Sequence, residues 1–397
     1  MANLTVNDYL DNLDIDKHNL VKALRSGNVI VDDNNTFTEL IPKVSALRQI
    51  VESDIIRTNE GPSVTTKAAP RILKVIKSLP SPFIIKNTAQ GAFAYFRGTK
   101  LPELQFEGTI NDFSYMYYSC GNVLNFPDLQ TPNATNMNSM YHGCHQLTNI
   151  PNMNTSNVTN MQNIFVSTNI QKCENFDAYN CTNLSNGFEY CSNLKSITNL
   201  KVSNKMQSLS GLCDGCGNLE TFTFSDDSDL SGVTSISSML SSCAKLVSIV
   251  FPNGLKNITS IGTLFYGCEA LKTFTGLDTS NVKYFDSAFL GCKSLESMPS
   301  LDMGKAISID SMFNSCNSLK NIEALTNLGK TGRNMNLDLS SCSYLTKESV
   351  NNIINSVYDV TSLGTTCKIN LPRYMHNYTV TDDDKQRAAA KGWTISN

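Results

Sequence analysis

The sequence predicts an α/β solenoid of about ten coils, each of about 24 residues, flanked by a small helical N-terminal module and an α/β C-terminal cap. Three observations predict this fold. A cysteine recurs at nearly constant spacing, apolar residues recur at fixed distances from it, and both ends of the chain follow other patterns. At 397 residues the chain also exceeds the length that one hydrophobic core usually serves.

The cysteine spacing defines the repeat. Successive aligned cysteines are separated by 24, 47, 25, 27, 25, 24, 24 and 26 residues, and the interval of 47 contains one further unit with Thr168 at the cysteine position. A period near 24 lies in the range of leucine-rich repeats. The aligned cysteines are Cys120, Cys144, Cys191, Cys216, Cys243, Cys268, Cys292, Cys316 and Cys342.

Apolar positions recur with each cysteine. Leucine or valine follows it by three residues, and isoleucine, phenylalanine or methionine follows by six, as in Leu271 and Phe274 after Cys268. Such side chains point inward and are buried only when coils stack. The stretch after the cysteine is rich in β-branched and aromatic residues and is predicted as the strand. The stretch before it spaces apolar residues by three, which favours a short helical or turn-like segment.

These repeats resemble the BspA-like subclass of leucine-rich repeats. The resemblance rests on "TSNVTNMQNIF" (155–165) and "LDTSNVKYFDSAFLGCKSLESM" (277–298), and it covers about residues 90–345. Residues 91–345 are therefore expected to form the solenoid. Three places depart from the pattern: the cysteine-free unit near 161–184, the insertion "DDSD" (226–229), and "GRNMNLDLSSCSYL" (332–345), where a terminal cap should begin.

The two ends have their own patterns. Residues 1–56 are predicted as a helical anchoring module, because "TFTELIPKV" (36–44) and the helix before it resemble N-terminal modules of phage tail and virion proteins. Residues 57–90 are expected to be a linker or an N-terminal cap. Residues 346–397 are predicted as a C-terminal cap with an amphipathic helix, a strand at "CKINLP", and a second helix with Thr381 as N-cap. Trp393 is expected to seal the end of the solenoid.

The repeated cysteines are predicted to be buried structural thiols, because a residue that recurs once per coil beside core positions belongs to the architecture. Disulfides between neighbouring coils and a metal or redox role are the alternatives. Cys213 and Cys216 form an isolated Cys-x-x-Cys pair, which is too little for a zinc site. His142 and His145 are expected to be surface histidines rather than ligands. "DDSD" is expected to be a solvated insertion, with a calcium loop as the alternative. No cofactor or metal is predicted.

Candidate contact residues lie on the exposed strand face. Small polar residues recur five positions after the cysteine, beginning with Thr148 and Asn149, and charges of alternating sign recur four positions after it. This face suits a protein or a mixed-charge glycan. A solvated charged face without a ligand is the alternative. The charged candidates are Lys195, Glu220, Lys272, Glu296 and Lys320.

Composition and motifs narrow the function. A net charge of −3 with 17% charged residues argues against nucleic acid as a partner. We expect no membrane insertion and no secretion signal, because no long apolar run occurs and the N-terminus has no apolar core of a signal peptide. Nucleophile elbows, phosphate loops and metalloprotease motifs are absent from the sequence, so no catalytic residue is predicted.

The expected function is that of a non-enzymatic phage virion structural protein, of a tail or head fibre or appendage type. Residues 1–56 would attach it to other virion proteins, and the repeats would bind a host-surface protein or glycan or a virion partner. It would be present as a homo-oligomer or in many copies in the particle, after synthesis in the host cytoplasm. A bacterial BspA-like surface adhesin is the first alternative. A glycan-degrading enzyme is the second, although no isolated acid pair supports it.

Overall fold

The computed structural model describes residues 83–86, 88–252 and 254–397. The chain divides into two compact units, Met1–Ile170 and Gln171–Asn397. The expected anchoring module over residues 1–56 and most of the expected linker or cap lie outside the described residues. In the remainder, parallel coils stack as a solenoid of about nine turns, which confirms the predicted fold class.

In the first unit, strands β1 (Phe83–Lys86) and β2 (Leu104–Glu107) pair in parallel, with Phe83 opposite Leu104. β1 belongs to residues 57–90, so this segment supplies the first rung of the described stack. Beyond β2 the coils of this unit are joined by isolated parallel bridges, for example from Asp112 to Asn136. Strands there are short because coils such as "NIPNM" contain proline, which has no N–H to donate to a ladder.

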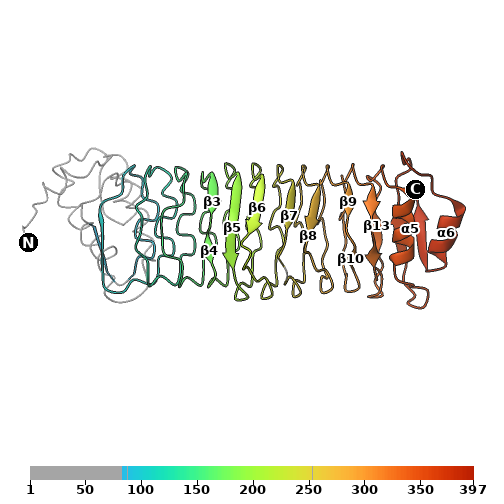
Figure 1. The fold of residues 1–397 in the computed structure, drawn as a ribbon, viewed down its shortest axis with the longest axis horizontal. Coiled ribbons are helices and arrows are strands. Elements are labelled where there is room, and N and C mark those ends of the chain that lie inside the picture. The colour runs from blue at the N-terminus through green and yellow to red at the C-terminus, as the bar shows by residue number, and fades with distance from the viewer. Residues whose placement is uncertain (1–82, 87, 253) are drawn as a thin grey trace, which may run out of the picture. The chain divides into compact units, whose positions relative to one another are not determined.

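In the second unit the strands lie side by side in chain order, and the helices lie at the C-terminal end (Figure 1). Every pairing between strands is parallel, as expected for coils that all run in the same direction. The sheets join β3 and β4 to β5, β5 to β6, β7 to β8, β9 to β11, β10 to β12, and β13 to β14 to β15. The strands are β3 (Lys172–Glu174), β4 (Asp177–Ala178), β5 (Ser196–Val202), β6 (Thr221–Phe224), β7 (Ser248–Val250), β8 (Thr273–Thr275), β9 (Ser297–Met298), β10 (Leu301–Asp302), β11 (Asn321–Ile322), β12 (Leu325–Thr326), β13 (Asn336–Asp338), β14 (Cys367–Asn370) and β15 (Trp393–Ser396).

The stretch before each cysteine forms consecutive turns, which is the turn-like form of the prediction. The N–H of Cys292 donates to the carbonyl oxygen of Phe289, three residues back in its own coil, at 3.1 Å. The N–H of Phe289 donates to Met312 O in the next coil at 3.0 Å. Because the backbone bonds alternate between the same coil and the next one, this side of the solenoid is tied together without a helix or a strand.

The core consists of columns of identical positions. Three residues before the cysteine, Phe265, Phe289 and Phe313 stack with ring centroids 5.8 Å apart. In the first unit Tyr117 and Tyr141 occupy the same column, 5.4 Å apart. All five rings are fully buried. Each coil therefore buries its aromatic ring against its neighbours, as the repeat pattern predicts.

The C-terminal cap continues the parallel sheet through two helices, α5 (Lys347–Ser356) and α6 (Asp382–Ala389). Thr346 caps α5, and Thr381 caps α6 in a capping box with Asp384, so the predicted N-cap is confirmed. Trp393 is fully buried at the start of β15, and its indole Nε1 donates to Tyr358 O at 2.9 Å. The buried indole confirms the expected sealing residue.

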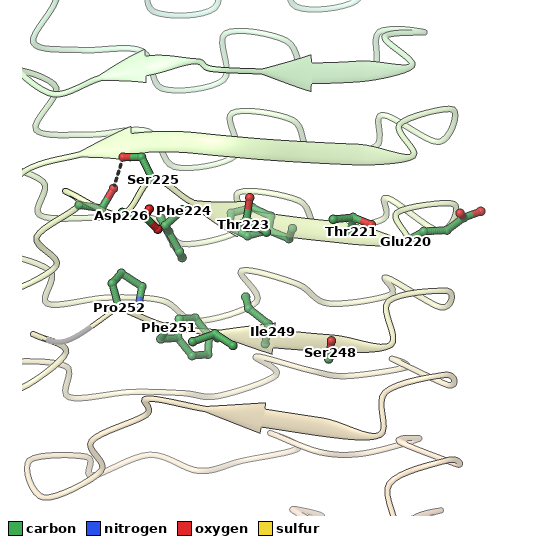
Figure 2. Close-up of a pocket in the computed structure, with 13 residues that line it drawn as sticks. Glu220, Thr221, Thr223, Phe224, Ser225, Asp226, Ser248, Ile249, Phe251 and Pro252 are labelled. Carbon is green, nitrogen blue, oxygen red and sulfur yellow. Dashed lines mark hydrogen bonds between the residues drawn. The ribbon is translucent and has the colours of Figure 1, made fainter.

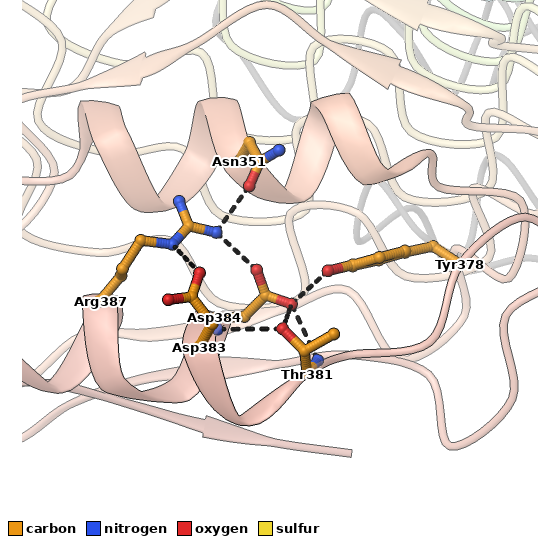
Figure 3. Close-up of polar contacts among 6 residues, drawn as sticks. All are labelled: Asn351, Tyr378, Thr381, Asp383, Asp384 and Arg387. Carbon is orange, nitrogen blue, oxygen red and sulfur yellow. Dashed lines mark hydrogen bonds and ion pairs between the residues drawn. The ribbon is translucent and has the colours of Figure 1, made fainter.

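A buried carboxylate holds the two cap helices together (Figure 3). Asp384, whose side chain is 2% exposed, accepts hydrogen bonds from the N–H and hydroxyl of Thr381, both at 2.8 Å, and from the Tyr378 hydroxyl. Its other oxygen pairs with Arg387 at 2.5 Å, and Arg387 also donates to Asn351 of α5 at 2.6 Å. Burial alone would raise the pKa of Asp384, but these donors outweigh it and lower that pKa. The acid is a structural anion.

Candidate functional site

Five predicted contact residues lie one position before a strand of the second unit. Their side chains are exposed, except that Lys320 is partly covered. They belong to the edge of the sheet where the coils enter their strands, rather than to the strands themselves. These residues are Lys195 before β5, Glu220 before β6, Lys272 before β8, Glu296 before β9 and Lys320 before β11.

The two predicted contacts of the first unit have a different setting. Thr148 and Asn149 are exposed, and the Asn149 side-chain amide donates to Thr148 Oγ1 at 3.2 Å. They lie in irregular chain, so their assignment to a strand was wrong. Pro151 follows closely and has no N–H for a ladder, which explains the absence of a strand at this coil.

Alternating charges on neighbouring coils pair with each other. The N–H of Lys320 donates to Glu296 O at 2.9 Å, which brings the two residues side by side, and the Lys320 ammonium lies 2.8 Å from the Glu296 carboxylate. The Lys320 hydrogen bond and charge, with a further contribution from Lys272, lower the pKa of Glu296. Lys293 and Glu269 form the same kind of pair at 2.7 Å. The alternation thus serves contacts between coils within the chain.

A groove of about 670 Å³ lies between β6 and β7 (Figure 2). These successive strands are not paired, whereas β6 is paired with β5 and β7 with β8. The break coincides with the insertion after β6, which lengthens the interval between Cys216 and Cys243 to 27 residues. The walls are Glu220, Thr221, Phe222, Thr223, Phe224, Ser225, Asp226 and Ser228 on one side and Ser248, Ile249, Val250, Phe251 and Pro252 on the other.

Backbone groups of β7 point into this groove. Phe251 donates to Thr275 O at 2.9 Å and Val247 accepts from Lys272 N at 2.8 Å, so odd-numbered residues of this segment face β8. Since backbone directions alternate along a strand that pairs in parallel, the N–H and C=O groups of Ser248 and Val250 face β6. The groove therefore offers main-chain donors and acceptors as well as side chains.

The insertion at the end of the groove is held by its own side chains. Asp227 pairs with Lys201 at 2.8 Å, and a hydrogen bond from Lys201 is the main cause of its lowered pKa. Asp229 accepts the N–H of Ser231 at 2.8 Å, and Ser225 Oγ lies 2.9 Å from Ser228 Oγ. Asp226 is exposed on the groove wall. Two carboxylates of "DDSD" are thus engaged within the protein, and Asp226 faces the groove.

All thirteen cysteines are free and buried, which confirms the structural reading of the nine aligned thiols. The thiol of one coil donates to the carbonyl oxygen three positions before the cysteine of the previous coil: Cys292 Sγ lies 3.2 Å from Phe265 O, and Cys268 Sγ lies 3.0 Å from Leu240 O. Burial raises the pKa of Cys268 to about 12. Such thiols form little thiolate near neutral pH and are poor nucleophiles.

The histidines beside Cys144 have ordinary surroundings. His142 is half-buried and its ring stacks on Tyr118 with centroids 4.7 Å apart, and burial lowers its pKa. His145 is exposed, and its Nδ1 lies 2.8 Å from Ser167 O. Among the described residues, no group of three or more His, Cys, Asp or Glu side chains is arranged to hold a metal ion. The same residues include no helix that is long and apolar enough to cross a membrane.

The sequence identified Glu220 but not the groove beside it. Thr221 and Ser248 stood out only as members of the polar column five residues after the cysteine. Val250, 66% exposed, and Asp226 were not singled out as contacts. The interval of 27 residues between cysteines was the one available signal, because a longer coil cannot keep every strand in register with the next.

Stacked parallel coils with one set of inward positions per repeat define a leucine-rich-repeat solenoid. Residues 234–365 match the BspA-type leucine-rich repeat region in six copies, and residues 111–222 match a family described as Mycoplasma protein of unknown function, DUF285. The chain is a BspA-type leucine-rich-repeat protein that also carries a DUF285 module. No curated protein and no solved structure matches it.

Proposed function

We propose that the protein is a non-enzymatic binding protein whose repeats present the exposed strand face to a surface partner. The observation that carries this proposal is the row of exposed side chains at one position of successive coils, which includes Lys195, Glu220 and Lys272. Because the row repeats with the coil, a long partner makes many similar contacts whose free energies add. BspA-type repeats support a role in binding at a surface.

The binding face is tested by charge reversal. A triple variant, Lys195→Glu, Lys272→Glu and Lys320→Glu, is compared with Lys256→Glu, Lys283→Glu and Lys305→Glu, which change exposed lysines elsewhere in the second unit. Purified labelled protein is titrated onto host cells. The first triple should weaken binding by about tenfold or more, while the second should leave it within about twofold. Equal effects of the two triples would refute the role of this face.

We further propose that the protein is a component of a phage virion, attached to the particle by residues 1–56. Support comes from the resemblance of "TFTELIPKV" and the preceding helix pattern to N-terminal modules of phage tail and virion proteins. Deleting residues 1–60 should abolish incorporation into particles and leave the circular dichroism of the repeats unchanged. Incorporation of the truncated protein would show that the segment is not an anchor.

A bacterial surface adhesin is the second candidate, and the BspA-type match favours it. The two candidates differ in their genomic setting. Neighbouring portal, tail or capsid genes support the virion, whereas a neighbouring cell-wall anchoring system supports the adhesin. Fractionation gives an independent test, because the virion protein sediments with particles and the adhesin stays with the cell envelope.

A further inference from the structure

We propose that the groove between β6 and β7 binds a chain of uncharged hexopyranose units. The inference deepens the proposed binding function and rests on it, since it names the ligand class of one part of the same exposed face. Four properties of the groove support it: its size, its mixture of donors and acceptors, its exposed apolar patch, and the sign of its charges.

The size of the groove selects a narrow ligand. Its volume of about 670 Å³ lies within the range of small-ligand sites, about 300–1,000 Å³. A stable interface with a folded protein needs about 800 Å² on each partner, which a groove between two short strands does not supply. An oligosaccharide or a single extended segment of chain fits these dimensions.

The hydrogen-bonding groups favour a polyol over a peptide. A peptide that joins a sheet needs an open strand edge. The edges of β6 and β7 that line the groove face each other, so neither is open in the plane of the sheet. Sugar hydroxyls enter from above, and because each one donates and accepts, they match both the N–H and the C=O groups of Ser248 and Val250.

Side-chain hydroxyls extend this match along the groove. Thr221, Thr223 and Ser248 are exposed on its two walls (Figure 2). Thr223 Oγ1 already accepts the N–H of Asn199 at 3.0 Å, which leaves its hydrogen available to a ligand. The polar lining is therefore dense and mostly uncharged, as hydroxyl-rich ligands require.

An apolar patch completes the lining. Val250 is 66% exposed, and Pro252 follows it on the same wall. Isolated exposed apolar side chains are common on proteins, but here the valine lies inside a concave site between hydroxyl groups. A pyranose ring has one face of C–H groups, which would cover Val250 while its equatorial hydroxyls reach the walls.

The charges exclude anionic polymers. Glu220 and Asp226 are the charged residues of the lining, and no lysine, arginine or histidine is among them. Carboxylates accept hydrogen bonds from neutral hydroxyls and repel phosphates and uronates. The ligand should therefore carry no negative charge.

Calorimetric titration of the full chain tests the ligand class. The probes are four neutral hexasaccharides, namely cellohexaose, chitohexaose, maltohexaose and β-1,4-mannohexaose, with hexagalacturonate as the anionic counterpart. At least one neutral probe should bind with a sub-millimolar Kd, and hexagalacturonate should bind at least about tenfold more weakly. Failure of all four neutral probes, or tighter binding of hexagalacturonate, overturns the proposal.

Matched variants test the location. Val250→Trp fills the groove, and Thr275→Trp places the same side chain on the directly paired residue of β8, outside the groove. Binding should fall by about tenfold or more in the first and stay within about twofold in the second. If Val250→Trp does not fold, Glu220→Gln against Glu296→Gln gives the same comparison with smaller changes. Equal effects within either pair would place the ligand elsewhere and overturn the proposal.

Cell binding separates this inference from the proposed function. A Val250→Trp protein that still binds host cells, while binding no neutral hexasaccharide more weakly than the wild type, refutes the groove and leaves the binding function intact. Loss of cell binding in the lysine triple alone would also assign recognition to the charged row and refute the groove. Loss of both activities in Val250→Trp, with Thr275→Trp unaffected, supports the groove as the recognition site.

Discussion

Two left-handed backbone positions per repeat set the shape of each coil. They lie one and five residues before the cysteine, as in Gly291 with φ of 79° and Ser287 with φ of 53°. Most are glycine, serine or asparagine, whose small side chains tolerate this conformation, whereas Tyr115 and Tyr190 adopt it despite their size. The small-residue columns are visible in the sequence, but only the backbone geometry explains them.

The conserved geometry of the thiol explains why cysteine recurs. Cys292 is fully buried and donates to Phe265 O at 3.2 Å. Thr168 stands at the cysteine position of another coil and donates to Phe165 O at 2.9 Å, so a hydroxyl is accepted there. Cys292→Thr should therefore be more stable than Cys292→Val by about 1 kcal/mol, since the two variants differ in the donor. Urea denaturation measures the difference, and a valine variant of equal or greater stability would refute the role of the hydrogen bond.

Two buried tyrosine hydroxyls are places where the stack can be improved. Tyr141 is fully buried, and its hydroxyl has no hydrogen-bond partner in the described part of the chain. Other coils have Phe165 or Phe289 in this column. Tyr141→Phe should raise the free energy of unfolding by about 1 kcal/mol, because an unsatisfied polar group leaves the core. Thermal unfolding compares it with Tyr95→Phe, at a partly exposed ring, and a destabilised Tyr141→Phe would reveal a partner for the hydroxyl.

At the scale of elements, the sequence predicted what depends on composition and local chemistry. The core columns, the caps of α5 and α6 and the burial of Trp393 follow from apolar spacing and capping residues. Strand lengths and the break between β6 and β7 depend instead on whether neighbouring coils keep register. That property belongs to pairs of coils. The groove could therefore be suspected from the 27-residue interval, but not located.

The cap helices should lose a specific stabilisation in acid. The donors around Asp384 lower its folded pKa, so its contribution is present above the unfolded pKa of about 3.9 and is lost as pH falls through the folded value. Asp384→Asn should destabilise the cap at pH 7 by about 1–3 kcal/mol, and the difference from the wild type should shrink below about pH 4. Trp393, the single tryptophan, reports cap unfolding by fluorescence.

The comparison for this prediction is Asp382→Asn, at an exposed residue of the same first turn. It removes a charge from the helix N-terminus without touching the buried network, so its effect should be no more than about 0.3–1 kcal/mol. A difference between wild type and Asp384→Asn that stays constant from pH 7 down to pH 3 would show that ionisation of Asp384 does not stabilise the cap.

At the scale of the whole molecule, stability comes from contacts between neighbouring coils. Backbone bonds, stacked rings, thiols and ion pairs all join positions about one repeat apart, as with Phe289 and Phe313 or Glu296 and Lys320. Such an array behaves as a nearly one-dimensional sum of coils and interfaces. What matters for folding is therefore the phase of the repeat rather than the number of coils.

Deletion of one complete coil tests this property. Removal of residues 269–292 joins Cys268 to Lys293 and keeps the repeat in phase, so the ring of Phe265 can stack on that of Phe313 as it does on Phe289. The variant should keep its β-rich circular dichroism and unfold cooperatively, with a urea m-value reduced by roughly the share of one coil. Removal of residues 269–280 deletes half as much chain but shifts every later apolar position out of register, and it should abolish the folded spectrum. If the half-coil deletion folds as well as the full-coil deletion, phase does not govern stacking in this protein.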